Sequence, residues 1–122
     1  MNFRTRKLVK HGDLNPNETL FGGRLLEWID EEVAIYVICQ LGTKRVVTKV
    51  ISEINFMKPA RLNDVVEIGV DVVEFGRTSI TVEVVARIKD NKDEILKINK
   101  MVFVSVDETG KPTPHGKTKK TR

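Results

Sequence analysis

The sequence predicts an α+β domain in which a curved antiparallel β-sheet wraps around one central α-helix. From Gly22 to about Ile38 the apolar residues recur with the period of a helix, and after Gly42 the period changes to two. Short connections rich in Gly, Asn and Asp separate the later segments, as expected for antiparallel strands. One helix covers four long strands only when the sheet curls around it, which strongly twisted strands allow.

The predicted helix carries one apolar stripe with a carboxylate at each edge. The stripe consists of Leu25, Leu26, Ile29, Val33, Tyr36 and Val37. Asp30 lies on one flank of the stripe and Glu32 on the other, whereas Glu27 and Glu31 point to solvent. A carboxylate beside apolar side chains is expected to be partly desolvated and more basic. The periodicity thus indicates two candidate carboxylates, Asp30 and Glu32, without choosing between them.

Four strand-like segments follow the helix, each with one apolar face. The residues that share this face are Val46, Val50, Ile54 and Phe56 in the first segment, Val66, Ile68, Val70 and Val72 in the second, and Ile80, Val82, Val84, Ala86 and Ile88 in the third. The fourth segment runs from about Ile95 to Val106. The connections 58–64, 76–77 and 90–93 predict a meander, the last two as tight hairpins. Because such a sheet leaves an exposed edge, we expect at least a dimer.

The charge distribution divides the chain into a domain at 1–107 and a basic tail at 108–122. The formal net charge of the 122 residues is +4, and the tail alone holds five basic residues against Glu108. It has no apolar segment to bury, so a flexible segment is expected. No aromatic residue is interleaved with its lysines, which argues against nucleic-acid binding.

The remaining composition favours a cytoplasmic protein that binds neither membrane nor metal. The single cysteine, Cys39, permits no disulfide within the chain. No apolar run approaches the roughly 20 residues that span a bilayer, and the first residues lack the apolar core of a signal peptide. His11 and His115 are too isolated to indicate a metal site.

The pair Gly22–Gly23 at the start of the helix is the first indication of chemistry. Glycines there let a ligand approach the free N–H groups at the positive end of the helix dipole. Those N–H groups are suited to receive the oxyanion that develops on an attacked carbonyl. No Cys-His pair or Ser-His-Asp order stands out as an alternative nucleophile. A carboxylate and an oxyanion site together suggest attack on a polarised carbonyl.

Several segments, in their order and spacing, resemble one family. They are Asp13-Leu14-Asn15-Pro16-Asn17, Leu20-Phe21-Gly22-Gly23, Trp28-Ile29-Asp30-Glu31, Val46-Val47-Thr48, Ile54-Asn55-Phe56, Pro59-Ala60 and Gly76-Arg77-Thr78-Ser79. Together with the order of helix and strands, they make the chain similar to the hotdog-fold acyl-CoA thioesterases of the YciA-like and cytosolic acyl-CoA hydrolase group. The resemblance extends from about Val9 to Asp107.

The resemblance implies hydrolysis of acyl-CoA to free CoA and a carboxylic acid, without metal or bound cofactor. It also implies homodimers, often assembled into hexamers as trimers of dimers, with each active site at a dimer interface. The catalytic carboxylate of the family matches Asp30, and its Asn partner from the other subunit matches Asn15 better than Asn17. Asp30 then acts either as a general base toward water or as a nucleophile, and the sequence does not separate these routes.

The resemblance also assigns the coenzyme contacts. It implies that Arg77, Thr78 and Ser79 contact CoA, with Arg77 on a phosphate, and that Thr48 lines the path of the pantetheine. Two positions depart from the family pattern. Glu18 stands where a Gly is common, and Cys39-Gln40-Leu41-Gly42, with one extra residue, stands where relatives carry a His near the end of the helix, so that Leu41 is apolar where a polar group is expected. Both departures are expected to alter substrate preference rather than remove the catalytic pair.

Two other functions compete with hydrolysis. A hotdog domain of this size can bind or sense acyl-CoA without cleaving it. A hotdog dehydratase requires a His paired with a carboxylate, and no His lies on the predicted helix.

Overall fold

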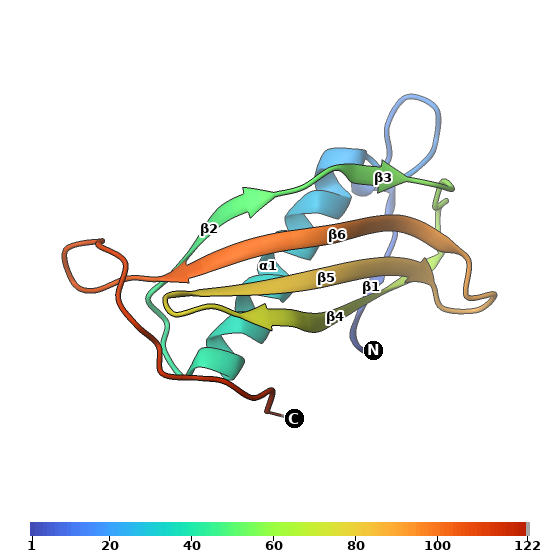
Figure 1. Ribbon diagram of the computed structural model, residues 1–122. Coiled ribbons are helices and arrows are strands. Elements are labelled where there is room, and N and C mark those ends of the chain that lie inside the picture. The colour runs from blue at the N-terminus through green and yellow to red at the C-terminus, as the bar shows by residue number, and fades with distance from the viewer. Residues whose placement is uncertain (122) are drawn as a thin grey trace.

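The computed structural model describes residues 1–121 as one long helix in the hollow of a six-stranded antiparallel sheet (Figure 1). Arg122, the last residue of the predicted tail, lies outside the described residues. The elements are β1 (Asn2–Leu8), the short 3-10 helix η1 (His11–Asp13), α1 (Gly22–Leu41), β2 (Val46–Ile51), β3 (Ile54–Phe56), β4 (Val65–Phe75), β5 (Ser79–Ile88) and β6 (Glu94–Ser105). The predicted α+β architecture is confirmed.

The strand order β1-β4-β5-β6-β2 confirms part of the predicted meander and corrects one connection. β4, β5 and β6 are neighbours joined by short turns, as predicted. β2 and β3 both pair with β6, so the connection 58–64 does not join neighbouring strands as predicted. A connection of this length imposes no hairpin register, unlike the two shorter ones.

The edge strand β1 is absent from the sequence prediction. Its outward residues include Arg4 and Arg6, and it shows no apolar alternation that would mark a strand. The buried carboxylate of Glu67 holds it to the sheet: Glu67 lies 3.5 Å from Arg6 Nε on β1 and 3.2 Å from Arg87 Nε on β5. The Arg87 guanidinium also lies 3.5 Å above the ring centre of Phe3 on β1. These charge contacts take the place of an apolar pattern.

The helix α1 buries the predicted stripe and one polar residue that was not predicted. Leu25, Ile29, Val33 and Val37 are buried against the sheet, and the next turn buries Gln40. The helix ends at Gly42, whose φ of 71° permits the left-handed conformation in which its N–H reaches Ile38 O.

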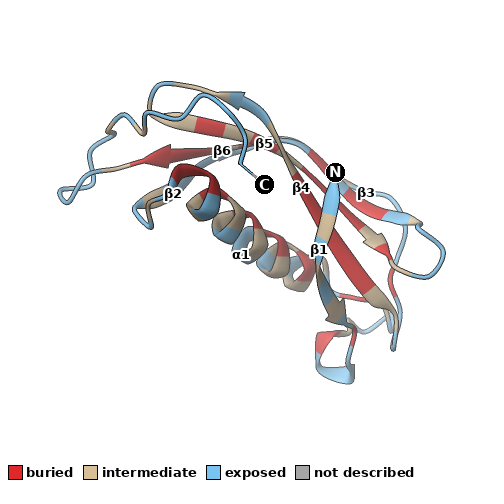
Figure 2. Cartoon of the chain, turned by 90° about the horizontal axis from the view of Figure 1, so that it is seen from below, coloured by how far each residue is buried: buried red, intermediate tan, exposed pale blue. Residues whose placement is uncertain are grey.

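The core lies between α1 and the concave face of the sheet. Figure 2 shows the sheet curving over the helix, with buried residues on the strands that face it. The inward residues of β4, β5 and β6 include Val66, Ile68, Ile80, Val82, Ile98 and Phe103. Each large apolar side chain buried in this way contributes about 1.5–3 kcal/mol.

A β-bulge bends the sheet beside the first half of the helix. Val82 pairs with Met101, but Val84 pairs with Ile98, so β6 has one extra residue between these pairs. Across from this bulge the outer strand breaks between β2 and β3, and Ser52 N–H bonds to the Lys100 carbonyl. The bulge turns both Ile98 and Met101 toward the helix.

The basic segment 108–121 makes contacts that the sequence did not predict. Thr113 N–H bonds to Ser105 O, and the His115 ring nitrogen Nε2 lies 2.8 Å from Ser79 O. Near its end, the Thr121 backbone forms two hydrogen bonds with the buried Gln40 side chain, at 2.8 and 3.0 Å. The segment thus runs from the end of β6 to the last turn of α1 (Figure 1).

Among the described residues, no helix is long and apolar enough to cross a membrane.

Candidate active site

The start of α1 presents backbone donors beside a well-fixed loop. Phe21, which precedes the helix, makes no side-chain cap, so the N–H groups of the first turn have no side-chain acceptor at that position. A Cβ at Gly22 would lie 3.2 Å from the Phe56 ring, so a larger residue there requires this exposed ring to shift by a few tenths of an ångström. A Cβ at Gly23 would meet nothing within 4 Å, which leaves that face open. The arrangement suits a ligand oxygen.

The loop that carries Asn15 is bound to this helix start. The buried Asp13 carboxylate accepts the Lys10 N–H at 2.9 Å and lies 3.3 Å from Arg24 Nε on the helix. The Asp13 carbonyl accepts the N–H of Phe21 at 2.9 Å. Asn15, Gly22 and Gly23 therefore belong to one rigid unit, which we call the donor half.

Within the chain, Asn15 acts as a turn residue. Its Oδ1 accepts the N–H groups of Asn17 and Thr19, and its Nδ2 donates to Thr19 Oγ1 at 2.9 Å. In the same turn Glu18 has a φ of 62°, a left-handed conformation that favours the Gly common at this position. Whether Asn15 takes part in catalysis stays a prediction.

Asp30 lies further along α1 and contacts β2. Thr48 Oγ1 donates to Asp30 Oδ1 at 3.3 Å, and its place on the pantetheine path stays a prediction. The Asp30 side chain is exposed in the single chain, contrary to the partial burial expected beside the apolar stripe. We call Asp30 and Thr48 the carboxylate half. In the sequence, Asp30 and Thr48 are connected only because both belong to segments that resemble the family.

An open groove of about 290 Å³ lies beside Asp30. It lies between α1 and the strands β2, β3 and β6, and it is lined mainly by Leu26, Ile29, Ile51, Ile54, Ile98 and Met101. Gly23, Glu27 and Asp30 form its polar part. A carboxylate at the edge of an apolar groove is able to act on a polar group attached to an apolar chain.

Within one chain, the donor half and the carboxylate half lie too far apart to contact the same carbonyl group. Gly22 and Asp30 are eight residues apart on a continuous helix, which corresponds to about 12 Å along its axis. Groups that act on one carbonyl must each lie within about 3 Å of it. Each half therefore lacks its complement within a single chain.

The predicted coenzyme loop lies at another end of the molecule. Gly76, Arg77, Thr78 and Ser79 form the turn between β4 and β5, which lies near the end of α1 rather than its start (Figure 1). The backbone of the turn is fixed by Gly76 N–H to Ser79 O and by Ser105 N–H to Thr78 O. The Arg77 side chain is exposed. Within one chain this loop and Asp30 are not assembled into one site.

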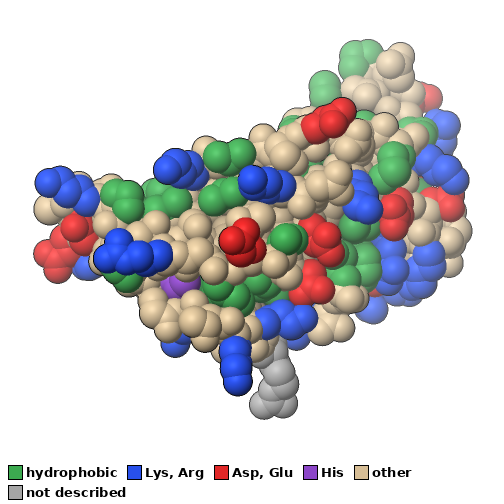
Figure 3. All heavy atoms as spheres, viewed as in Figure 1, with side chains coloured by type: hydrophobic (Ala, Val, Ile, Leu, Met, Phe, Trp, Pro, Cys, Tyr) green, Lys and Arg blue, Asp and Glu red, His purple; other side chains and the backbone are tan. Residues whose placement is uncertain are grey.

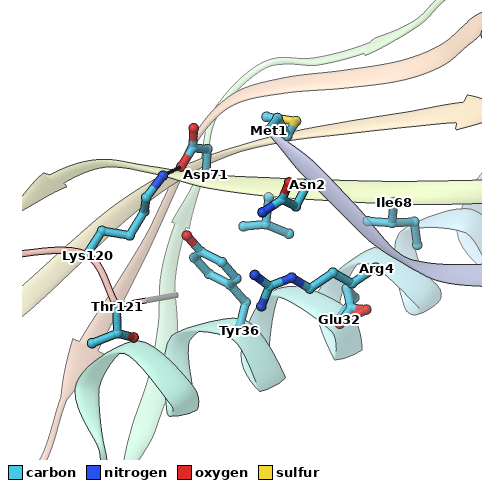
Figure 4. Close-up of a pocket in the computed structure, with 10 residues that line it drawn as sticks. Met1, Asn2, Arg4, Glu32, Tyr36, Ile68, Asp71, Lys120 and Thr121 are labelled. Atoms are coloured by element: carbon cyan, nitrogen blue, oxygen red, sulfur yellow. Dashed lines mark hydrogen bonds and ion pairs between the residues drawn. The ribbon is translucent and has the colours of Figure 1, made fainter.

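Glu32, the other candidate carboxylate, lines a second cavity of about 330 Å³ on the opposite flank of α1. Figure 4 shows Glu32 and Tyr36 from the helix facing Arg4 of β1, with Lys120 bonded to Asp71 at one end. Burial raises the pKa of Glu32, while Lys7 and Arg4 oppose the shift. No backbone donors of a helix start adjoin this cavity, whose lining is drawn from β1, β4, the middle of α1 and the tail.

The described residues also contain no cluster of metal-binding side chains. Among residues 1–121, no three His, Cys, Asp or Glu side chains lie close enough to hold a metal ion.

Comparison with known proteins gives the family. The model of the Thioesterase superfamily matches residues 17–95. The acyl-CoA thioester hydrolase YciA of Salmonella typhimurium is 32% identical over 115 residues, which cover 89% of this chain and 86% of that protein.

Solved structures agree with this match. A hexameric thioesterase from Yersinia pestis superposes with a TM-score of 0.84 at 28% identity, covering 93% of each chain. An acyl-CoA hydrolase from Staphylococcus aureus, solved with butyryl coenzyme A and coenzyme A, gives 0.81 at 33% identity, covering 90% of this chain and 66% of that one. The curved sheet around α1 is thus the hotdog fold, and the chain belongs to the thioesterase superfamily.

Proposed function

We propose that this protein hydrolyses acyl-CoA thioesters to free CoA and a carboxylic acid, with Asp30 as the reacting carboxylate. The observation that carries this proposal is the Asp30 carboxylate, held by the Thr48 hydroxyl at the edge of an apolar groove. The acyl-CoA hydrolase relatives at about 30% identity support the same substrate class.

Two routes fit this arrangement. In the first, Asp30 takes a proton from water as the water oxygen bonds to the thioester carbon. In the second, an Asp30 oxygen itself attacks the carbon, and water then hydrolyses the resulting anhydride. In both, the carbonyl oxygen becomes an oxyanion held by N–H groups, the C–S bond breaks, and CoA leaves as a thiolate. Since a thiolate is a good leaving group, no metal or bound cofactor is required.

The site is completed, in this proposal, by a second copy of the chain. Two α1 helices that run antiparallel about a two-fold axis would set the Asp30 of each beside the Gly22, Gly23 and Asn15 of the other. In this pairing, each carboxylate half meets the donor half of the other subunit, and not the donor half about 12 Å away on its own helix. It yields two complete sites per dimer.

The free edge of β2 supports such a pairing. Val47, Val50 and Ile51 are all more than 40% exposed, and β2 pairs with β6 on one side only. Hydrophobic side chains gather along this edge in Figure 3. An apolar, unpaired edge strand is suited to bind another copy. The hexameric assembly of the Yersinia pestis relative supports a trimer of such dimers.

The coenzyme contacts follow from the same assembly. Arg77 is exposed on a fixed turn, and a guanidinium binds phosphate oxygens in a bidentate manner. We assign it to a CoA phosphate, with Thr78 and Ser79 beside it, in the site shared with a second subunit.

Release of free thiol from a panel of acyl-CoAs tests the proposed function. A hydrolase releases CoA with multiple turnovers, and this is the expected result. A sensor binds acyl-CoA without releasing thiol, and a dehydratase leaves the thioester intact while changing the acyl chain. Binding without thiol release would therefore contradict the proposal, and mass spectrometry of the products separates the last two cases.

A further inference from the structure

We propose that Met101 and Ile98 close the Asp30 groove and limit the substrate to short acyl chains. This inference rests on the proposed function and concerns the part of the substrate that the groove receives. The groove changes in exposure along its length. Gly23 and Asp30 are exposed, Ile54 is half-buried, and Ile29, Ile98 and Met101 are at most 1% exposed. An acyl chain whose thioester lies at Asp30 would therefore end against these buried side chains.

The floor of the groove is a product of the β6 bulge. In a regular strand Ile98 and Met101 would point to opposite faces, because they are three residues apart. The extra residue between their pairs with Val84 and Val82 turns both toward α1. Across the sheet, the same two residues pair with Ile54 and Ile51, which form the side wall. The bulge thus sets Ile98 and Met101 on the floor, while Ile54 and the exposed Ile51 lie beside them.

The size of the groove sets the chain length. The groove has a volume of about 290 Å³, near the lower end of about 300 Å³ for small-molecule pockets, which favours a short acyl chain. Met101 and its cross-strand neighbour Val82 both belong to the buried core. Longer chains would have to displace packed side chains, which is costly in a close-packed interior. The volume therefore favours short chains over long ones.

Met101 is the residue that decides this limit. Its unbranched thioether side chain fills irregular space and is easily shortened or replaced. Met101→Ala lengthens the groove, and we expect the ratio of kcat/KM for dodecanoyl-CoA to that for hexanoyl-CoA to rise about tenfold. Met101→Phe shortens the groove, and we expect the ratio for hexanoyl-CoA to butyryl-CoA to fall by a similar factor. A ratio taken on one preparation is independent of the fraction of active enzyme.

Leu96→Ala is the matched control. Leu96 is fully buried in the same strand but does not line the groove, so its truncation also weakens the core. We expect it to leave the chain-length ratios unchanged. If Met101→Ala folds poorly, Met101→Phe, checked by circular dichroism, carries the test alone.

The outcomes separate this inference from the proposed function. Opposite shifts for Met101→Ala and Met101→Phe, with none for Leu96→Ala, would support it. An active wild-type enzyme whose chain-length profile is the same in both Met101 variants would overturn the inference and leave the hydrolase assignment intact. A wild-type protein that cleaves no acyl-CoA of any length would overturn both.

Discussion

The donor half and the carboxylate half lie on the same helix, yet they are built in opposite ways. The donor half contains no ionisable catalytic group and offers backbone N–H groups at a helix start, fixed by the contact between Asp13 and Arg24. The carboxylate half depends on two side chains, Asp30 of α1 and Thr48 of the edge strand β2. The first can stabilise a charge and the second can transfer a proton or attack a carbonyl. In the proposed mechanism a complete reaction therefore needs both halves.

Removal of the Asp30 carboxylate should have the largest effect. In Asp30→Asn the side chain keeps its size but loses its capacity to accept a proton or attack. We expect kcat for acyl-CoA to fall about a thousandfold, with an unchanged melting temperature because the side chain is exposed. Steady-state thiol release and a thermal melt measure these two quantities. Turnover near the wild-type level would remove Asp30 from the chemistry.

Loss of one backbone donor should have the next largest effect. Gly23→Pro removes an N–H in the first helical turn, where proline is tolerated. We expect kcat to fall about a hundredfold. Gly23→Ala is the control, because its Cβ meets nothing within 4 Å and the N–H remains. Equal losses in both variants would show that space, and not the donor, matters at this position.

The Thr48 hydroxyl should contribute less. Thr48→Val keeps the shape of the side chain and removes the hydrogen bond to Asp30. We expect kcat to fall about tenfold, in keeping with about 1–1.5 kcal/mol for one hydrogen bond. Thr48→Ser, which restores the hydroxyl, should recover most of the rate. If KM rises instead while kcat stays constant, Thr48 lines the pantetheine path, as the family resemblance implies.

Glu32, on the other flank of the helix, should have the smallest effect on the reaction. We expect Glu32→Gln to keep kcat/KM within about threefold of wild type, the scale of a substitution outside the reacting groups. Because burial raises the pKa of Glu32 in the folded protein, ionisation of this group at neutral pH disfavours folding. The variant should therefore melt slightly higher at pH 7, and this gain should vanish below the ordinary pKa of 4.5. A loss of activity comparable to that of Asp30→Asn would reverse the choice between the two carboxylates.

Much of the fold follows from local patterns in the sequence. The stripe of α1 and the hairpins of β4, β5 and β6 have regular periods and short connections, so their prediction is confirmed. β1 escaped prediction because charged pairs around Glu67, and not apolar alternation, hold it. The β6 bulge was not predicted, because one inserted residue turns the following side chains to the other face of the sheet without a distinct sequence signal.

The candidate site was less accessible to sequence reasoning. Periodicity left Asp30 and Glu32 equal, and only the resemblance to a family separated them. The contact between Asp30 and Thr48 joins a helix to a strand across 18 positions, a tertiary relation that no local period encodes. The separation of Gly22 from Asp30 along the helix, in contrast, is fixed by helix geometry alone.

Mixing two defective chains tests the shared site most directly. Asp30→Ala lacks the carboxylate half, and Asn15→Ala changes the donor half, so we expect each homo-oligomer to be strongly impaired. In a mixed dimer, one site carries both substitutions and the other carries neither. Co-expression of the two chains with different tags, followed by purification of the species that carries both tags, should raise thiol release well above that of either separate variant, toward half the wild-type rate for each mixed dimer. Activity no greater than the mean of the two separate variants would contradict a site shared between subunits.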